Sequence, residues 1–366
     1  MEPGWAHPPF AAEMADGYVW GRGTLDAKNQ VAAAAAVLKL LKGEGLRLKR
    51  DVILSVTADE ECGGRMGARF LVDHHPDAVR AEIAFGELGG VNTYLADTCF
   101  YLIGVAEKGC AHVRATCRGV AGHGSVPSGE NPVVSLARAL DRIGGRRLPQ
   151  HVVPAVDRFL TAIQQALPFP KSLYVPLMRI PRIADFLIAR DIPRRDQARI
   201  FASMLANTAT PTGLAAGSKH NVVPAVATAD LDCRTLPGQT EADLLRELAA
   251  VAGAGVELSI VDAASPVDAP IDGVAMRAIR RAIASHHPGA RAIPSLNPGS
   301  TDGKHYARLG THCYGFTPLR FDRGEAAQLG RLIHGTDERV PVDGFRWGLR
   351  VLHDVVRSLA LGESEA

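Results

Sequence analysis

The chain has 366 residues, of which 46% are apolar and 22% are charged, and its formal net charge is +2. This length and composition are typical of a globular protein with a sizeable core and two domains. The small net charge excludes an electrostatic case for binding nucleic acid or a membrane, because such proteins concentrate basic residues on one face. The longest apolar stretch, residues 31–38, is too short to cross a bilayer, which takes about 20 residues.

The first part of the chain, residues 18–106, alternates between helical and strand patterns. Helices are predicted at residues 29–41 and 65–72. Strands are predicted at residues 51–57, 83–86 and 100–105, and the first of these reads as a buried strand. This alternation is typical of an α/β fold with a largely parallel sheet.

From residue 108 the pattern changes to that of an antiparallel α+β unit. It predicts strands at 112–118, 222–234 and 256–261 and helices at 132–143 and 239–251, with a long helix-biased insert at 148–213. The α/β pattern then resumes, with helices at 274–285 and 344–361 and a strand at 312–316. We therefore predict one domain at residues 1–107 and 265–366, interrupted by a smaller domain at residues 108–264.

Three acidic residues are the strongest chemical signal in the sequence. Asp26 lies in Gly-Arg-Gly-Thr-Leu-Asp-Ala-Lys, and the adjacent Glu60 and Glu61 follow the strand predicted at residues 51–57. The two glutamates could simply begin a helix, where acids interact well with the positive end of the helix dipole. They could instead belong to a metal site, because open α/β sheets bind ligands at the carboxyl ends of their strands and one carboxylate can bridge two ions.

Eight segments, taken together and in order, decide between these interpretations. They are residues 5–10, 18–28, 59–64, 122–127, 221–224, 232–238, 299–306 and 334–340. With them the chain resembles the M20 family of metal-dependent peptidases and amidohydrolases, and most of all its carboxypeptidase S-like branch, over essentially its whole length. The resemblance implies a zinc-exopeptidase-like sheet with helices on both faces, in which the interrupting domain is a lid and dimerisation domain.

The resemblance also implies a dinuclear metal site. Asp26 would bridge the two metals, and Glu61 and His334 would complete the shell of one of them. Glu87 would serve the second metal, and Glu60 would be the general base that takes a proton from water. Aspartate, glutamate and histidine ligands suit zinc, with cobalt or manganese as substitutes. Without the family match, His334 could equally be a buried or capping histidine.

Further residues match a catalytic position of the family, which would stabilise the oxyanion, and several positions that bind substrate. His123, in Gly-His-Gly-Ser-Val-Pro, resembles a histidine that reaches into the site of a partner subunit, so the resemblance implies a homodimer; the alternative is an exposed loop residue. Asn221 and Arg234 resemble positions that hold a terminal carboxylate, although Asp232 could pair with Arg234 instead. Ser300 and Thr301 are expected to line the cleft.

One family segment, a strand ending in His-x-Asp-Val, would lie just upstream of Glu2 and is not part of this sequence. It supplies a ligand of the second metal, and His7 stands at the wrong offset to replace it. We therefore expect one tightly bound and one weakly bound metal. The alternative to an active enzyme is a truncated, catalytically impaired homologue that acts as a dimeric carboxylate-binding protein.

The function expected from these matches is hydrolysis of an amide bond next to a free carboxylate, by metal-activated water. The substrate would be a dipeptide, a C-terminal residue of a peptide or an N-acyl amino acid. The chain has six cysteines without Cys-x-x-Cys spacing, which is typical of reduced thiols and predicts a cytoplasmic protein.

Overall fold

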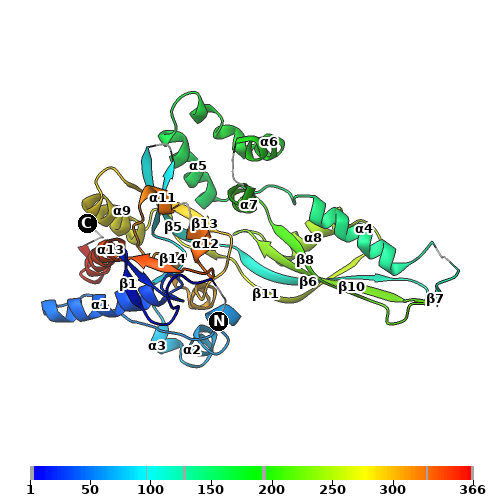
Figure 1. The fold of residues 1–366 in the computed structure, drawn as a ribbon, viewed down its shortest axis with the longest axis horizontal. Helices are drawn as coiled ribbons and strands as arrows, with labels where there is room; N and C mark the ends of the chain where they lie inside the picture. The colour runs from blue at the N-terminus through cyan, green and yellow to red at the C-terminus, as the bar shows by residue number, and fades with distance from the viewer. Residues whose placement is uncertain (1–3, 96, 127–128, 192–194, 327–328, 364–366) are drawn as a thin grey trace.

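The computed structural model describes residues 4–95, 97–126, 129–191, 195–326 and 329–363. The molecule is elongated: one sheet and its helices form a body on the left of Figure 1, and a second sheet extends from it to the right. Three helices of the insert, α5 to α7, lie above the junction of the two. Each sheet has its own apolar core among the described residues.

The body is built on a mixed sheet around one long strand. In the order in which they occur along the chain, its strands are β3 (Ile83–Gly86), β4 (Val91–Leu95), β5 (Thr98–Glu107), β12 (Val267–Asp268), β13 (Arg291–Asn297) and β14 (His312–Gly315). β13 runs parallel to β5 and β14 runs parallel to β3, whereas β4 and β12 pair with β5 in the antiparallel sense. The α/β class is confirmed, but the described sheet is mixed, not largely parallel.

Helices pack on this sheet through apolar side chains at helical spacing. α1 (Lys28–Glu44) contacts α13 (Val342–Ala360), which in turn contacts α9 (Val274–His286). Val37 of α1, Trp347 of α13 and Tyr101 of β5 are among the residues of one buried cluster. No helix of the described chain is both long and apolar enough to cross a bilayer.

Several short elements lie outside the two main sheets. A small antiparallel sheet joins β1 (Glu13–Ala15), β2 (Tyr18–Trp20) and β15 (Arg339–Pro341), and so places the beginning of the chain beside residues 339–341. The remaining short elements are η1 (Glu60–Cys62), α2 (Ala68–His74), α3 (Pro76–Val79), α10 (Gly303–Tyr306), η4 (Ala307–Leu309), α11 (Arg323–Ala326) and α12 (Leu329–Leu332).

The extension is an antiparallel sheet backed by two helices. Its strands lie in the order β11 (Glu257–Ala264), β6 (Gly109–Arg118), β10 (Val226–Thr235) and β8 (Thr208–Ala216), with α4 (Pro132–Gly145) and α8 (Glu241–Ala252) packed on it. α8 begins where the sequence predicts, because Thr240 and Asp243 form a capping box. These elements lie within residues 108–264, whose limits as a domain stay a prediction.

The helix-biased insert folds as α5 (Pro154–Ala166), η2 (Lys171–Leu173), η3 (Pro176–Arg179), α6 (Pro181–Asp191) and α7 (Arg195–Ser203). α5 packs against β13 of the body, and Val156 and Leu160 are fully buried there. The insert therefore contributes to the core of the body although it lies, in sequence, inside the unit that forms the extension. The tip of the extension carries a two-stranded sheet of β7 (Gly122–His123) and β9 (Val222–Val223).

The strand predicted at residues 51–57 is wrong. These residues have no strand structure, and Ile53, Leu54 and Val56 keep 48%, 36% and 58% of their surface exposed. The segment makes two side-chain hydrogen bonds: one joins the hydroxyls of Ser55 and Tyr306, and in the other Thr57 donates to Asp302. A β-rich sequence becomes a strand only when a neighbour pairs with its backbone, and no described strand does so here.

A buried lysine stands at the junction between β5 and β6. The Lys108 ammonium lies 3.0 Å from the carbonyl oxygen of Ser203, 2.8 Å from that of Ala206 and 3.2 Å from the hydroxyl oxygen of Thr208. Burial lowers the pKa of Lys108 from 10.5 to about 7, and Arg234 and Arg147 add to the effect. The Lys108 amine nitrogen donates to all three of these oxygens, so its polar partners are satisfied although it is buried.

We expect Lys108 to make folding stability depend on pH. The unfolded lysine binds a proton between pH 7 and 10.5 and the folded one does not, so stability rises with pH in that window and falls as the pH drops towards 7. The slope from this one group is at most about 1.4 kcal/mol per pH unit. Denaturant unfolding of Lys108→Met should show a flatter pH dependence than the wild type. The same slope in both proteins would contradict the assignment, and Lys39→Met, at an exposed position of α1, is the control.

Candidate metal centre

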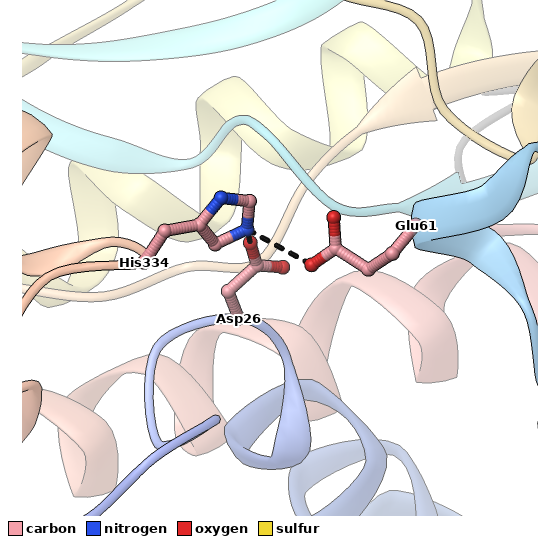
Figure 2. Close-up of side chains that lie close together, drawn as sticks. All are labelled: Asp26, Glu61 and His334. Carbon is pink, nitrogen blue, oxygen red and sulfur yellow. Dashed lines mark hydrogen bonds and ion pairs between the residues drawn. The ribbon is translucent and has the colours of Figure 1, made fainter. Parts of the chain in front are cut away.

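Three side chains from distant parts of the sequence meet at one edge of the body. The imidazole Nε2 of His334 lies 2.9 Å from a carboxylate oxygen of Asp26 and 2.9 Å from one of Glu61. One ligand atom from each residue lies within 4.8 Å of the other two. Figure 2 shows the three side chains pointing towards one another from separate segments. Two carboxylate oxygens and one imidazole nitrogen at this spacing are a donor set for a single metal ion.

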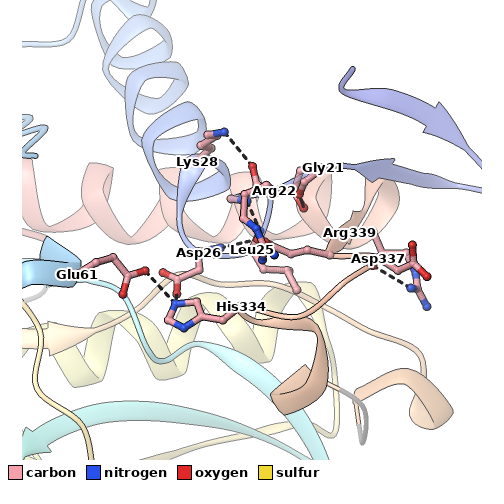
Figure 3. Close-up of polar contacts among 12 residues, drawn as sticks. Gly21, Arg22, Leu25, Asp26, Lys28, Glu61, His334, Asp337 and Arg339 are labelled. Carbon is pink, nitrogen blue, oxygen red and sulfur yellow. Dashed lines mark hydrogen bonds and ion pairs between the residues drawn. The ribbon is translucent and has the colours of Figure 1, made fainter. Parts of the chain in front are cut away.

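A buried carboxylate holds the Asp26 loop in place. Glu338, which is only 1% exposed, accepts hydrogen bonds from the backbone amides of Gly23, Leu25 and Asp26 at 2.9, 2.8 and 3.2 Å. Arg22 adds an ion pair to the same carboxylate at 3.1 Å. Figure 3 shows residues 334–339 running beside this loop. The segment that carries His334 therefore also fixes the position of Asp26.

The turn that carries Glu61 is shaped by residues with left-handed backbone. Asp59 has φ 70° and Gly64 has φ 67°, on either side of the single turn η1. A Cβ on Gly64 would lie 2.3 Å from a carboxylate oxygen of Asp302, so this close approach requires glycine. That Asp302 oxygen is buried and has no hydrogen-bond partner among the described residues. The turn thus brings Glu61 towards His334 and leaves Asp302 close behind it.

Two more glutamates lie beside Asp26. Burial, together with the neighbouring Glu60 and Asp26 carboxylates, raises the pKa of Glu87 to about 9. Burial also raises the pKa of Glu60, with a smaller contribution from Asp302 that Lys304 opposes. Carboxylates that are desolvated next to one another favour either protonation or a bound cation. The cluster therefore suits a cation of more than one positive charge.

His334 is the one cationic candidate within the three-residue group. Desolvation works against its protonation, but Glu61 and Asp26 outweigh that effect and raise the pKa of His334. The two carboxylates favour a proton on Nε2 of His334, which is also the atom that would bind a metal ion. Because only the neutral imidazole can bind a metal, metal uptake has to displace this proton. The donor set and the charge of the cluster both fit a divalent metal.

Comparison with known proteins agrees with this geometry. The sequence profile of peptidase family M20/M25/M40 matches residues 1–358. The chain belongs to this family. M20 membership makes it a hydrolase of the peptidase and N-acyl amino acid type, and the metallopeptidases of the family imply a divalent metal.

Related proteins align with nearly the whole length of this chain. It is 29% identical to the N-fatty-acyl-amino acid synthase/hydrolase PM20D1 of Bos taurus, over 98% of this chain and 71% of the relative. It is 25% identical to the probable carboxypeptidase S-like 2 of Dictyostelium discoideum, over 93% and 66%. The crystal structure of the M20 metallo-carboxypeptidase Sso-CP2 of Sulfolobus solfataricus shares the fold, with a TM-score of 0.64 and 16% identity over 96% of this chain and 80% of that one.

His123, predicted as a catalytic residue, and Asn221, predicted to bind substrate, lie far from the metal centre within one chain. His123 is exposed in β7 at the tip of the extension, away from the body (Figure 1). Asn221 lies beside it, because its carbonyl accepts a hydrogen bond from Gly124 at 2.8 Å and β9 pairs with β7. The structure therefore brings His123 and Asn221 together with each other and not with Asp26, Glu61 and His334. Their roles stay predictions.

The remaining predicted residues are engaged in contacts of their own. Arg234 forms a bidentate ion pair with Asp232, at 2.8 and 3.0 Å. This pairing is the alternative to carboxylate binding that the sequence left open. Thr301 is 3% exposed, and both its amide and its hydroxyl donate to the buried carboxylate of Glu107, at 2.9 and 2.7 Å. Thr301 therefore has no free donor for substrate. Ser300, next to it, is half-buried, and its role stays a prediction.

Two residues of this site are missing from the sequence-based prediction. Glu338 lies four positions after His334 in His-Gly-Thr-Asp-Glu-Arg, and Asp302 follows the predicted pair Ser300 and Thr301 directly. Both are inside segments that match the M20 family, so the segments themselves carried the signal. What sequence cannot show is that Glu338 is buried and bonded to the Asp26 loop, since an acid at that position could equally face water.

Proposed function

We propose that this M20 protein is a zinc-dependent hydrolase that cleaves an amide bond next to a free carboxylate, in a dipeptide, a C-terminal residue or an N-acyl amino acid. The observation that carries the proposal is the meeting of Asp26, Glu61 and His334, with Glu60 and Glu87 beside them. Aspartate, glutamate and histidine are ligands that zinc favours, and cobalt and manganese are possible substitutes. The names of the animal relatives support N-acyl amino acids as one substrate class.

Each acidic residue has a separate task in this proposal. Asp26, Glu61 and His334 would hold the cation, with Glu87 available beside Asp26 for a second one. A divalent cation there acts as a Lewis acid that lowers the pKa of water and polarises a carbonyl. Glu60 is not part of the three-residue ligand group and keeps its carboxyl available.

Glu60 is the proposed general base. It would take a proton from the attacking water as the C–O bond forms and the tetrahedral oxyanion appears. It would then pass that proton to the amide nitrogen, so that the C–N bond breaks and the amine leaves. Burial raises its pKa from the ordinary value, which moves it in the direction that favours proton transfer at neutral pH. Acid and base catalysis by one carboxyl of this kind typically contributes about 10²- to 10⁴-fold.

Removal of the metal provides the test of this function. Dialysis against a chelator is expected to abolish amide hydrolysis, and added zinc should restore it, with weaker recovery by cobalt or manganese. Release of free amine from a panel of dipeptides and N-acyl amino acids measures both steps. Full activity of protein that holds no metal, as shown by elemental analysis, would refute the proposal.

We further propose that the protein works as a homodimer in which the extension supplies His123 to the partner. Because His123 lies at the exposed tip of the extension, it can reach a metal centre only in another copy of the chain. There it would stabilise the charge that develops on the carbonyl oxygen. Asn221 lies at the same tip and would enter the partner's site together with His123. Arg234 lies near the base of the extension and would bind the substrate carboxylate in place of Asp232.

Mixing two inactive variants tests the shared site. His123→Ala and Glu60→Gln are each expected to be nearly inactive alone. A heterodimer of the two, isolated through different affinity tags, contains one site with both residues intact and should recover about half of the wild-type activity per dimer. A heterodimer as inactive as its parents would show that His123 does not act across the dimer.

A further inference from the structure

An apolar cavity opens directly beside the candidate metal centre. Its volume is about 460 Å³, and Asp26 and Glu87 are part of its wall. The insert and the segment before His334 supply half of its large apolar side chains, namely Phe159, Ile200, Phe201, Met204, Leu329 and Ile333. This volume lies within the range of about 300 to 1,000 Å³ that is usual for small-molecule sites.

The charge of the cavity limits what it can hold. Among the described residues of its wall, Asp26 and Glu87 are the only ionisable ones, and both are acids. A free carboxylate placed among the apolar side chains of this wall would lose its hydration and would find no cationic side chain there to pair with. The uncharged half of a substrate therefore fits the cavity and the carboxylate half does not.

Aromatic side chains from the insert close the cavity on one side. Phe159 of α5 and Phe201 of α7 face each other with ring centroids 6.3 Å apart. Ile200 of α7 lines the same space and keeps 53% of its surface exposed, so it lies where the cavity approaches solvent. Most of the wall belongs to the body, and α5 and α7 complete it, whereas no described residue of the four-stranded sheet that carries Arg234 is part of it.

We propose that this cavity binds the acyl chain of an N-acyl amino acid and that α5 and α7 set the preferred length of the chain. The inference rests on the proposed function, because it places the scissile amide at the Asp26, Glu61 and His334 centre. The acyl chain then lies among apolar side chains, and the amino-acid carboxylate points away from Asp26 and Glu87. At about 30 Å³ for each water-sized group, the cavity has room for a chain of about ten to fifteen carbons.

Hydrolysis rates as a function of chain length test the proposal. With one amino acid as the common leaving group, kcat/KM is expected to rise about fourfold for each methylene added between acetyl and the length that fills the cavity, and then to level off. Dipeptides with a short polar first residue should be poor substrates of the same preparation. Equal kcat/KM for acetyl and dodecanoyl substrates would overturn the proposal while leaving the proposed hydrolase function intact.

Two variants with opposite expected effects on the preferred acyl-chain length test the role of the insert. Ile200→Trp adds bulk to the wall and should lower the ratio of dodecanoyl to acetyl kcat/KM by at least about tenfold, the effect of two lost methylenes. Phe159→Ala removes bulk and should move the preferred length to longer chains. Leu40→Trp, at a position of α1 that is 47% exposed and not part of the wall, is the matched control and should leave the ratio unchanged.

Direct binding separates a failure of this inference from a failure of the proposed function. Calorimetry with the Glu60→Gln variant and N-dodecanoyl glycine should show affinity that falls with shorter chains and with Ile200→Trp in the same background. If no substrate is hydrolysed but this binding pattern is found, the acyl site stands and the hydrolase function falls. An affinity that depends neither on the length of the acyl chain nor on the Ile200→Trp substitution would overturn the acyl site.

Discussion

Replacing Glu60 with glutamine is expected to lower kcat for amide hydrolysis by about 10²- to 10⁴-fold, because the amide side chain cannot take a proton from water. Metal content should stay that of the wild type, since Glu60 is not one of the three residues whose ligand atoms converge. The glutamine is also close to the shape of the glutamate, so folding should be little affected. Single-turnover kinetics and elemental analysis of the same preparation measure the two effects.

Glu61→Gln is the matched control for this prediction. It makes the same chemical change one residue along the chain, in a side chain whose carboxylate oxygen lies 2.9 Å from Nε2 of His334. This variant should lose metal, and its activity should return when the metal concentration is raised. If the two variants lose the same amounts of metal and of activity, the division of tasks within this pair is wrong.

Glu338→Gln is expected to have the largest effect on stability. The Glu338 carboxylate is buried and accepts three backbone hydrogen bonds and an ion pair from Arg22. An amide in its place presents an NH₂ group to donors that need an acceptor, and unpaired buried donors are costly. We expect the free energy of unfolding to fall by about 3 kcal/mol. Metal affinity should fall too, because the Asp26 loop loses its anchor.

Asp343→Asn provides the comparison for Glu338→Gln. Asp343 is an acid close by in the sequence whose side chain is 89% exposed. Its replacement should change the free energy of unfolding by less than about 0.5 kcal/mol. Denaturant unfolding and zinc titration of both variants would check the prediction. Wild-type stability and wild-type zinc affinity in Glu338→Gln would show that the Glu338 contacts do not hold the site together.

The sequence predicts well those parts of the fold that depend on local patterns. The helices α1, α8 and α13 lie where the spacing of apolar residues indicates. The prediction of a strand at residues 51–57 was wrong, because a strand forms only beside a partner strand, which its own sequence does not specify. The mixed sheet has the same origin, since the direction of each pairing is set by distant parts of the chain.

For the candidate site, too, one part was predictable from the sequence and another part was not. The resemblance to the M20 family singled out Asp26, Glu61 and His334, which the structure places within reach of one ion. Burial and pairing were not predictable: Glu338 anchors a loop that lies more than three hundred residues earlier in the chain, and Thr301 is bonded to Glu107. Such contacts depend on the assembled fold, so a motif identifies the residue but not its partner.

The position of a bound metal tests the central claim most directly. Crystals of the zinc-loaded protein, measured at the zinc absorption edge, should show an anomalous peak about 2.0 to 2.2 Å from side-chain atoms of Asp26, Glu61 and His334. A further, weaker peak beside Glu87 would fit a second ion. Zinc bound elsewhere, with Nε2 of His334 still hydrogen-bonded to the two carboxylates, would contradict the account.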